Sequence, residues 1–78
     1  MTSSLTLFEE IVARTGLATF IGPGVVQRAL QSVGIYSFEV ATVEDYRRAL
    51  PALRARMATY LTEDQVEIRL REIMWLLR

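Results

Sequence analysis

Residues 42–61, TVEDYRRALPALRARMATYL, decide the fold class. Thr42 followed three residues later by Asp45 is a capping-box pattern, which opens a helix. The apolar residues that follow form one helical stripe about 100° wide, namely Val43, Tyr46, Leu50, Leu53, Met57, Tyr60 and Leu61. The stripe stays in phase across Pro51, so we expect one long helix that kinks there, or two helices that meet there. We favour the single helix.

A last helix is expected over residues 62–78, because Thr62 and Gln65 form another capping-box pattern. Its main apolar face is predicted to be Val66, Leu70, Ile73, Met74 and Leu77. No C-terminal cap signal follows, so we expect this end to fray, to continue or to dock.

The last helix also has a second apolar face. Ile68 and Trp75 are seven residues apart and point away from the main face, where the surface helix of a monomer is usually polar. Arg71 is placed to stack on the Trp75 indole, and Glu67 is placed to support the helix by pairing with Arg71. Such a helix is either covered on both sides within the chain, for example by residues 35–41, or used as an interface.

Two shorter helices are expected before residue 42. The first opens at the capping box of Thr6 and Glu9 and stops at Gly16. The second has Pro23 in its first turn, where the missing N–H costs nothing, and closes at Gly34.

Residues 35–41 alternate between apolar and polar side chains, which is a strand pattern. A single strand would have no pairing partner inside a helical chain. We expect either an extended loop packed by its aromatic residues or a strand paired across a dimer.

We therefore predict an all-α fold, a compact bundle of four to five short helices with room for one short extended segment at 35–41. Residues 1–78 are expected to form one helical domain, either a whole protein or the N-terminal domain of a longer one. The predicted core consists of Phe8, Ile11, Val26, Leu30, Leu50, Leu53, Met57, Leu70 and Ile73.

The composition argues against most enzymes. The chain has no histidine, cysteine, lysine or asparagine, and all nine basic residues are arginine. It therefore lacks a thiolate nucleophile, an imidazole base and a Schiff-base amine, as well as the nitrogen and sulfur ligands of zinc. The adjacent acids Glu9-Glu10 and Glu63-Asp64 diverge on a helix and suit the first-turn dipole. We expect no catalytic residue, no cofactor and no metal.

Nine acidic residues balance the nine arginines, so no global field favours nucleic acid or an anionic membrane. The N-terminus lacks the features of a secretory signal. The longest uncharged stretch, residues 15–27, is too short and too broken to span a bilayer. We expect a cytoplasmic protein without membrane contact.

The turn at residues 20–25, FIGPGV, resembles that of helix-hairpin-helix modules. In that family, a Gly-apolar-Gly turn between two short helices offers backbone N–H groups to a DNA phosphate. The resemblance implies phosphate contacts by Gly22 and Gly24. Pro23 departs from the pattern because it removes one donor, and no basic residue follows before Arg28. A tight corner between two helices is the alternative.

Four arginines and no acidic residue lie between Tyr46 and Leu61: Arg47, Arg48, Arg54 and Arg56. On a continuous helix, Arg47 and Arg54 share one flank of the apolar stripe. Arg48 faces away from the stripe, and Arg56 lies on the other flank. This scatter does not form one row along a phosphate backbone, so a solvated helix surface is the alternative.

These features predict a non-enzymatic protein–protein interaction or homodimerisation domain, a regulatory or adaptor module whose partner is itself or another protein. The interface is expected at Ile68, Arg71 and Trp75, with Tyr36 and Phe38. The alternative is a small helical nucleic-acid-binding module that uses the Gly22-Pro23-Gly24 turn and the arginine cluster. A sensor of apolar small molecules, with its pocket between helices, is a third hypothesis.

Overall fold

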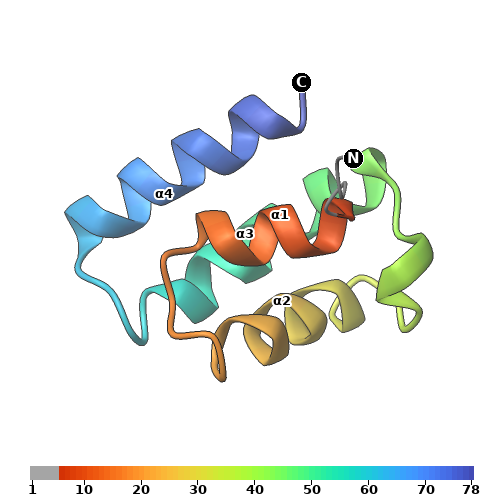
Figure 1. Ribbon diagram of the computed structural model, residues 1–78, viewed down its shortest axis with the longest axis horizontal. Helices are drawn as coiled ribbons and strands as arrows, with labels where there is room; N and C mark the ends of the chain where they lie inside the picture. Colours follow the sequence, from red (N-terminus) through yellow and green to blue (C-terminus); the bar gives the residue numbers. More distant parts are fainter. Residues whose placement is uncertain (1–5) are drawn as a thin grey trace, which may run out of the picture.

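The computed structural model describes residues 6–78. These residues form four α-helices and contain no strand (Figure 1). The helices are α1 (Leu7–Arg14), α2 (Gly22–Gln31), α3 (Val43–Met57) and α4 (Glu63–Leu76), and a 3₁₀ turn, η1 (Phe38–Val40), lies between α2 and α3. The prediction of a small all-α bundle is confirmed.

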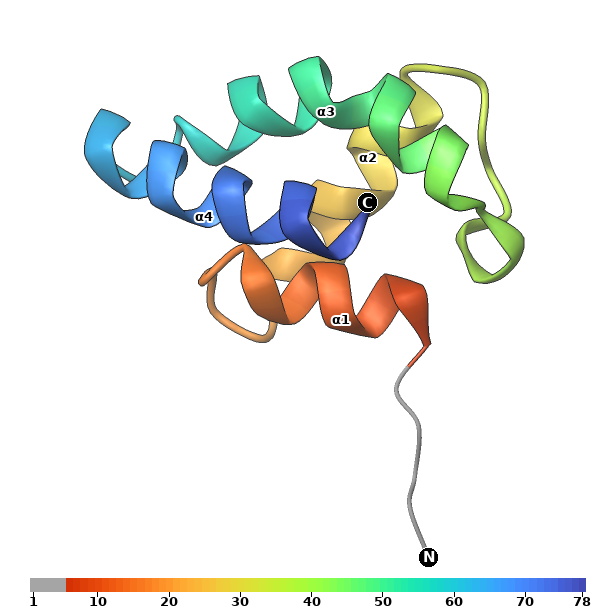
Figure 2. The ribbon, with the colours of Figure 1, turned by 90° about the horizontal axis from the view of Figure 1, so that it is seen from above.

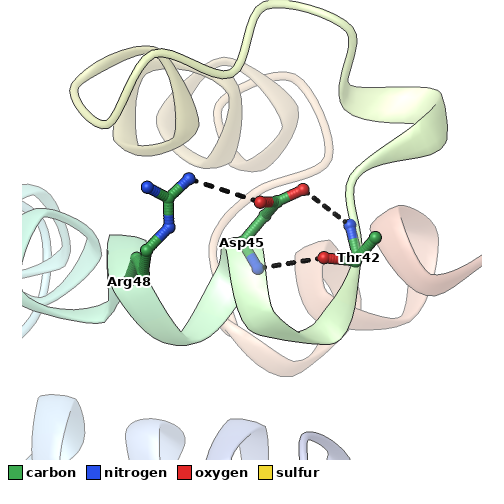
Figure 3. A network of polar contacts seen from close by, with 3 residues as sticks. All are labelled: Thr42, Asp45 and Arg48. Atoms are coloured by element: carbon green, nitrogen blue, oxygen red, sulfur yellow. Dashed lines mark hydrogen bonds and ion pairs between the residues drawn. The ribbon is translucent and has the colours of Figure 1, made fainter.

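Three of the helices begin at the predicted capping boxes, at Thr6, Thr42 and Thr62. In the box of α3, the Asp45 amide donates to Thr42 Oγ1 at 3.2 Å and the Thr42 amide donates to the Asp45 carboxylate at 3.0 Å (Figure 3). The hydrogen bond from the Thr42 backbone lowers the pKa of Asp45. Arg48 contacts the same carboxylate at 3.3 Å.

Two glycines end the first two helices, and a third glycine lets these helices pack closely. Gly16 after α1 and Gly34 after α2 have φ values of +73° and +87°, in the left-handed region that favours glycine. Gly22, at the start of α2, is buried, and a Cβ at this position would lie 3.0 Å from Val12 Cγ1 of α1. The missing side chain therefore lets α1 and α2 approach each other.

The helices pack around one core. The most extensive contact joins α2 and α3, while α1 lies between α2 and α4, and α4 also contacts α3 (Figures 1 and 2). Of the predicted core residues, Phe8 and Leu50 are partly buried and the others are buried. The remaining buried apolar residues are Val25, Ala29, Tyr46, Ala49, Val66 and Leu77.

α3 continues through Pro51 as one helix rather than two, which confirms the single-helix part of the preferred alternative. Pro51 is exposed on the helix surface. The apolar stripe was predicted to extend to Leu61, but α3 ends at Met57 and Tyr60 is exposed. Thr59 and Tyr60 belong to the turn that leads into α4.

Residues 35–41 form a loop with a 3₁₀ turn, and the strand alternative is wrong for this structure. The 3₁₀ geometry interrupts the alternation, so Val40 points to solvent rather than along a strand face. Phe38 packs on Phe8 of α1, with ring centroids 4.2 Å apart and planes tilted by 40°. Of the aromatic residues in this loop, Phe38 anchors it and Tyr36 is exposed.

Among the described residues, the core contains one buried side-chain polar atom without a hydrogen-bond partner. Tyr46 is buried in α3, and its hydroxyl has no hydrogen-bond partner within residues 6–78. Burial raises the pKa of Tyr46 to about 12, and the negative charge of Asp45 adds to this effect.

We predict that Tyr46→Phe raises the free energy of unfolding near pH 7 by about 1 kcal/mol, because it removes an unpaired buried hydroxyl and keeps the ring. The unfolded tyrosine ionises near pH 10 and the folded one near 12. The wild type should therefore lose stability relative to the variant as the pH rises above about 10, by roughly 1 kcal/mol more near pH 11. Urea unfolding near pH 7 and near pH 11 measures both effects. A variant less stable than the wild type near neutral pH would contradict the prediction.

Candidate protein-interaction surfaces

Two apolar residues of α4 point away from the core. Trp75 is 67% exposed and Ile68 is 51% exposed. The other side of the same helix contributes Val66, Leu70, Ile73 and Leu77 to the core. We call the surface of Ile68, Arg71 and Trp75 the outward face of α4. The chain itself therefore does not cover Ile68 and Trp75, and the alternative in which both sides of α4 are buried within the chain is wrong.

The charged neighbours of Trp75 differ from those predicted. Arg78, not Arg71, lies over the indole ring, with its guanidinium carbon 3.9 Å from the ring centroid. Glu67 forms an ion pair with Arg54 of α3 rather than with Arg71. The partner of Glu67 comes from another helix, which spacing along α4 cannot reveal. Arg78, in contrast, follows Trp75 by three residues, a spacing that the sequence could have indicated. Arg71 remains exposed, without an ion pair among the described residues.

The other predicted interface residues do not lie on this face. Tyr36 is exposed and Phe38 is packed on Phe8, and η1 lies beside the start of α3, apart from α4 (Figures 1 and 2). The predicted interface thus divides into the outward face of α4 and a separate loop.

The four arginines of the α3 region have different surroundings. Arg47 donates to the Leu77 carbonyl at the end of α4 and lies 3.6 Å from Glu44. Arg48 is paired with Asp45, and Arg54 with Glu67. Arg56 is exposed and makes no ion pair within residues 6–78. The Arg47 contact supplies the C-terminal cap of α4 that the sequence did not reveal.

An open groove between α3 and α4 was not predicted. Three adjoining hollows of about 300, 270 and 110 Å³ share Met74 in their walls. Their apolar residues are Leu50, Pro51, Leu70, Met74 and Leu77, and their charged residues are Arg47, Arg54, Glu67, Arg71 and Arg78. We call these ten residues the α3–α4 groove.

Met74 was assigned to the buried face of α4, and this prediction is wrong because the residue is 54% exposed. It lies at the edge of the apolar face, on the flank of α4 that lines the groove.

The Gly22-Pro23-Gly24 segment is the first turn of α2 rather than a free loop. The Gly22 amide donates to the Ala18 carbonyl at 2.9 Å, and Pro23 has no N–H. Of these three residues, only Gly24 has an N–H group that makes no hydrogen bond to another described backbone group. This geometry favours the tight-corner interpretation of the turn.

A second open hollow, of about 440 Å³, lies beside α1 and is lined by Phe8, Glu9, Val12, Ala13, Thr19 and Pro23. Within residues 6–78, no group of three acidic side chains is placed to hold a metal ion. No helix of this part of the chain is both long enough and apolar enough to cross a membrane.

Comparisons with protein families, curated proteins and solved structures gave no match.

We predict opposite effects at the two glycines of the turn. Gly22→Val should lower the free energy of unfolding by about 1–3 kcal/mol, because its side chain would enter the contact with Val12. Gly24→Ala should raise it by roughly 0.5–1 kcal/mol, because nothing lies within 4 Å of the added Cβ and the unfolded chain loses freedom. Thermal unfolding of both variants measures the difference, and equal effects would contradict a packing role for Gly22.

Proposed function

We propose that this chain is a non-enzymatic protein–protein interaction domain that forms a homodimer through the outward face of α4. The observation that carries the proposal is the exposure of Ile68 and Trp75 together on a helix whose other side is already in the core. Tryptophan and arginine are among the residues most often found to dominate binding energy at interfaces. A regulatory or adaptor role follows from an interface without catalytic groups.

An antiparallel pairing of two α4 helices suits the sequence of this face. A two-fold axis that passes midway between residues 71 and 72 sets the isoleucine of one copy against the tryptophan of the other. The same register places Arg71 of each copy opposite Glu72 of the other, which forms two ion pairs. A parallel pairing in register would oppose Arg71 to Arg71, which is unfavourable.

The free energy available from this face sets the expected affinity. Burying a side chain of this kind contributes roughly 1.5–3 kcal/mol when it is fully exposed beforehand, and Ile68 and Trp75 are only partly exposed. Association costs at least about 4 kcal/mol in lost freedom of motion. Four such side chains, two from each copy, together with the two exposed ion pairs leave a net free energy of at most about 5 kcal/mol, so we expect a dissociation constant on the order of hundreds of micromolar.

We predict that Trp75→Ala weakens the dimer roughly tenfold or more and leaves the helix content unchanged, because the side chain lies outside the core. Phe20→Ala is the matched control, since Phe20 is 85% exposed in the α1–α2 turn and outside α4. Light scattering over a concentration series gives the molar mass, and circular dichroism gives the helix content. A wild type that stays monomeric at concentrations well above the expected dissociation constant, with its tryptophan open to a quencher, would contradict the homodimer.

The register can be tested by exchanging the opposed charges. We predict that Arg71→Glu weakens the dimer, because two glutamates then face each other, and that Arg71→Glu combined with Glu72→Arg restores much of the affinity, because opposite charges face again. Sedimentation equilibrium measures the dissociation constants. If the double variant is as weak as Arg71→Glu alone, the antiparallel register is wrong, even if the outward face is the interface.

A further inference from the structure

The α3–α4 groove combines an apolar floor with a basic rim. Leu70 and Leu77 form its buried base, Leu50 is half-buried, and Met74 and Pro51 are exposed along its edges. Methionine adapts to varied apolar partners and is common at binding surfaces of this kind. The groove is thus open and apolar, and the described part of the chain does not fill it.

The charge of the groove is unlike that of the chain. The groove contains four of the nine arginines and one acidic residue, Glu67, although the whole chain is neutral. The rest of the sequence therefore has five arginines against eight acidic residues. A basic rim on an otherwise acidic molecule attracts and orients an acidic partner.

We propose that the α3–α4 groove binds an amphipathic helix with acidic flanks, supplied by another protein. This site is distinct from the proposed homodimer interface, although Arg71 belongs to both surfaces. The apolar stripe of the bound helix would lie on Leu50, Leu70 and Met74, with its carboxylates paired to the arginines of the rim.

The dimensions of the groove fit a short helix. Along α4 it extends from Glu67 to Arg78, which is about 16 Å at the rise of an α-helix and equals roughly three helical turns. Its walls, α3 and α4, run in opposite directions (Figures 1 and 2), so a third helix can lie along them with anchors at i, i+3, i+4 and i+7. No strand edge lies among the described residues to pair with an extended peptide.

The rim arginines have the freedom to receive carboxylates. The Arg54–Glu67 pair is exposed on both sides, and exposed pairs contribute little to stability, so Arg54 can exchange its partner at small cost. Arg71 makes no ion pair within residues 6–78. Arg47 donates to the Leu77 carbonyl and lies 3.6 Å from Glu44, and the remaining N–H groups of its guanidinium are available to a ligand. A floor of leucine and methionine favours a helix over a nucleic-acid backbone, which offers no apolar stripe.

The test uses the full chain and synthetic fluorescent helices of about 14 residues, read by fluorescence anisotropy. One peptide has leucines on one face with glutamates beside them, a second has lysines in place of the glutamates, and a third has serines in place of the leucines. The protein variants are Arg54→Glu on the rim and Arg56→Glu as the matched control. Both change the charge of α3 equally, but Arg56 does not line the groove. Met74→Ala tests the floor without a charge change.

We expect the glutamate peptide to bind with micromolar affinity, and the lysine and serine peptides to bind at least roughly tenfold more weakly. Arg54→Glu should weaken binding of the glutamate peptide roughly tenfold and Met74→Ala about fivefold, while Arg56→Glu should change it less than about twofold. The Trp75→Ala variant should still bind, which separates this site from the homodimer.

Three results would overturn the proposal: equal binding of the glutamate and lysine peptides, equal effects of Arg54→Glu and Arg56→Glu, or no binding of the glutamate peptide below millimolar concentration. Duplex DNA that binds more tightly than the glutamate peptide at physiological salt, and loses affinity on Arg54→Glu, would show that the rim is a phosphate-binding surface instead. If Arg54→Glu lowers the melting temperature by several degrees, its effect on binding no longer tests the groove, and Met74→Ala is the deciding variant. Unchanged peptide binding by Met74→Ala would then contradict the proposal.

Discussion

Ile11, Leu30, Met57 and Ile73 come from the four different helices and are completely buried in one core. The rest of the structure depends on this shared core, because the chain has no cysteine for a disulfide and neither histidine nor cysteine for a structural zinc site. A domain this small can gain only a few kcal/mol from its core. Each helix must therefore direct its most continuous apolar stripe inwards, and apolar residues outside that stripe stay exposed. This constraint places Trp75 on the surface, since the face opposite to it is needed for the core.

The elements that could be predicted from the sequence are those determined by local interactions. A capping box joins residues three apart, so Thr6, Thr42 and Thr62 mark the starts of three helices. Gly16 and Gly34 mark helix ends because the left-handed conformation that they adopt is a local property. Most of the predicted core follows from helical periodicity, which depends only on spacing along one helix.

The features that the sequence did not reveal are contacts between helices. Arg47 caps α4 from a position thirty residues earlier in the chain, and Glu67 pairs across to α3 rather than along its own helix. The exposure of Met74 depends on the distance between α3 and α4, which spacing within α4 does not determine. Spacing along α3 could assign Arg47 and Arg54 to one flank of that helix. It could not predict the groove beside them, because the other wall of the groove is α4.

The two proposed surfaces meet along α4, and this has an energetic consequence. Arg71 belongs to the outward face and also lines the groove, while Arg78 lines the groove and lies over the Trp75 ring. A carboxylate bound in the groove would compete for both guanidinium groups. It would draw Arg71 from its proposed partner, Glu72 of the second copy, and Arg78 from the indole. The first change weakens the dimer, whereas the second frees a face of the indole for contact. Linkage between two binding equilibria is reciprocal, so dimerisation would also alter the affinity of the groove for the acidic helix. The sign of this coupling depends on whether the bound helix engages Arg71 or Arg78.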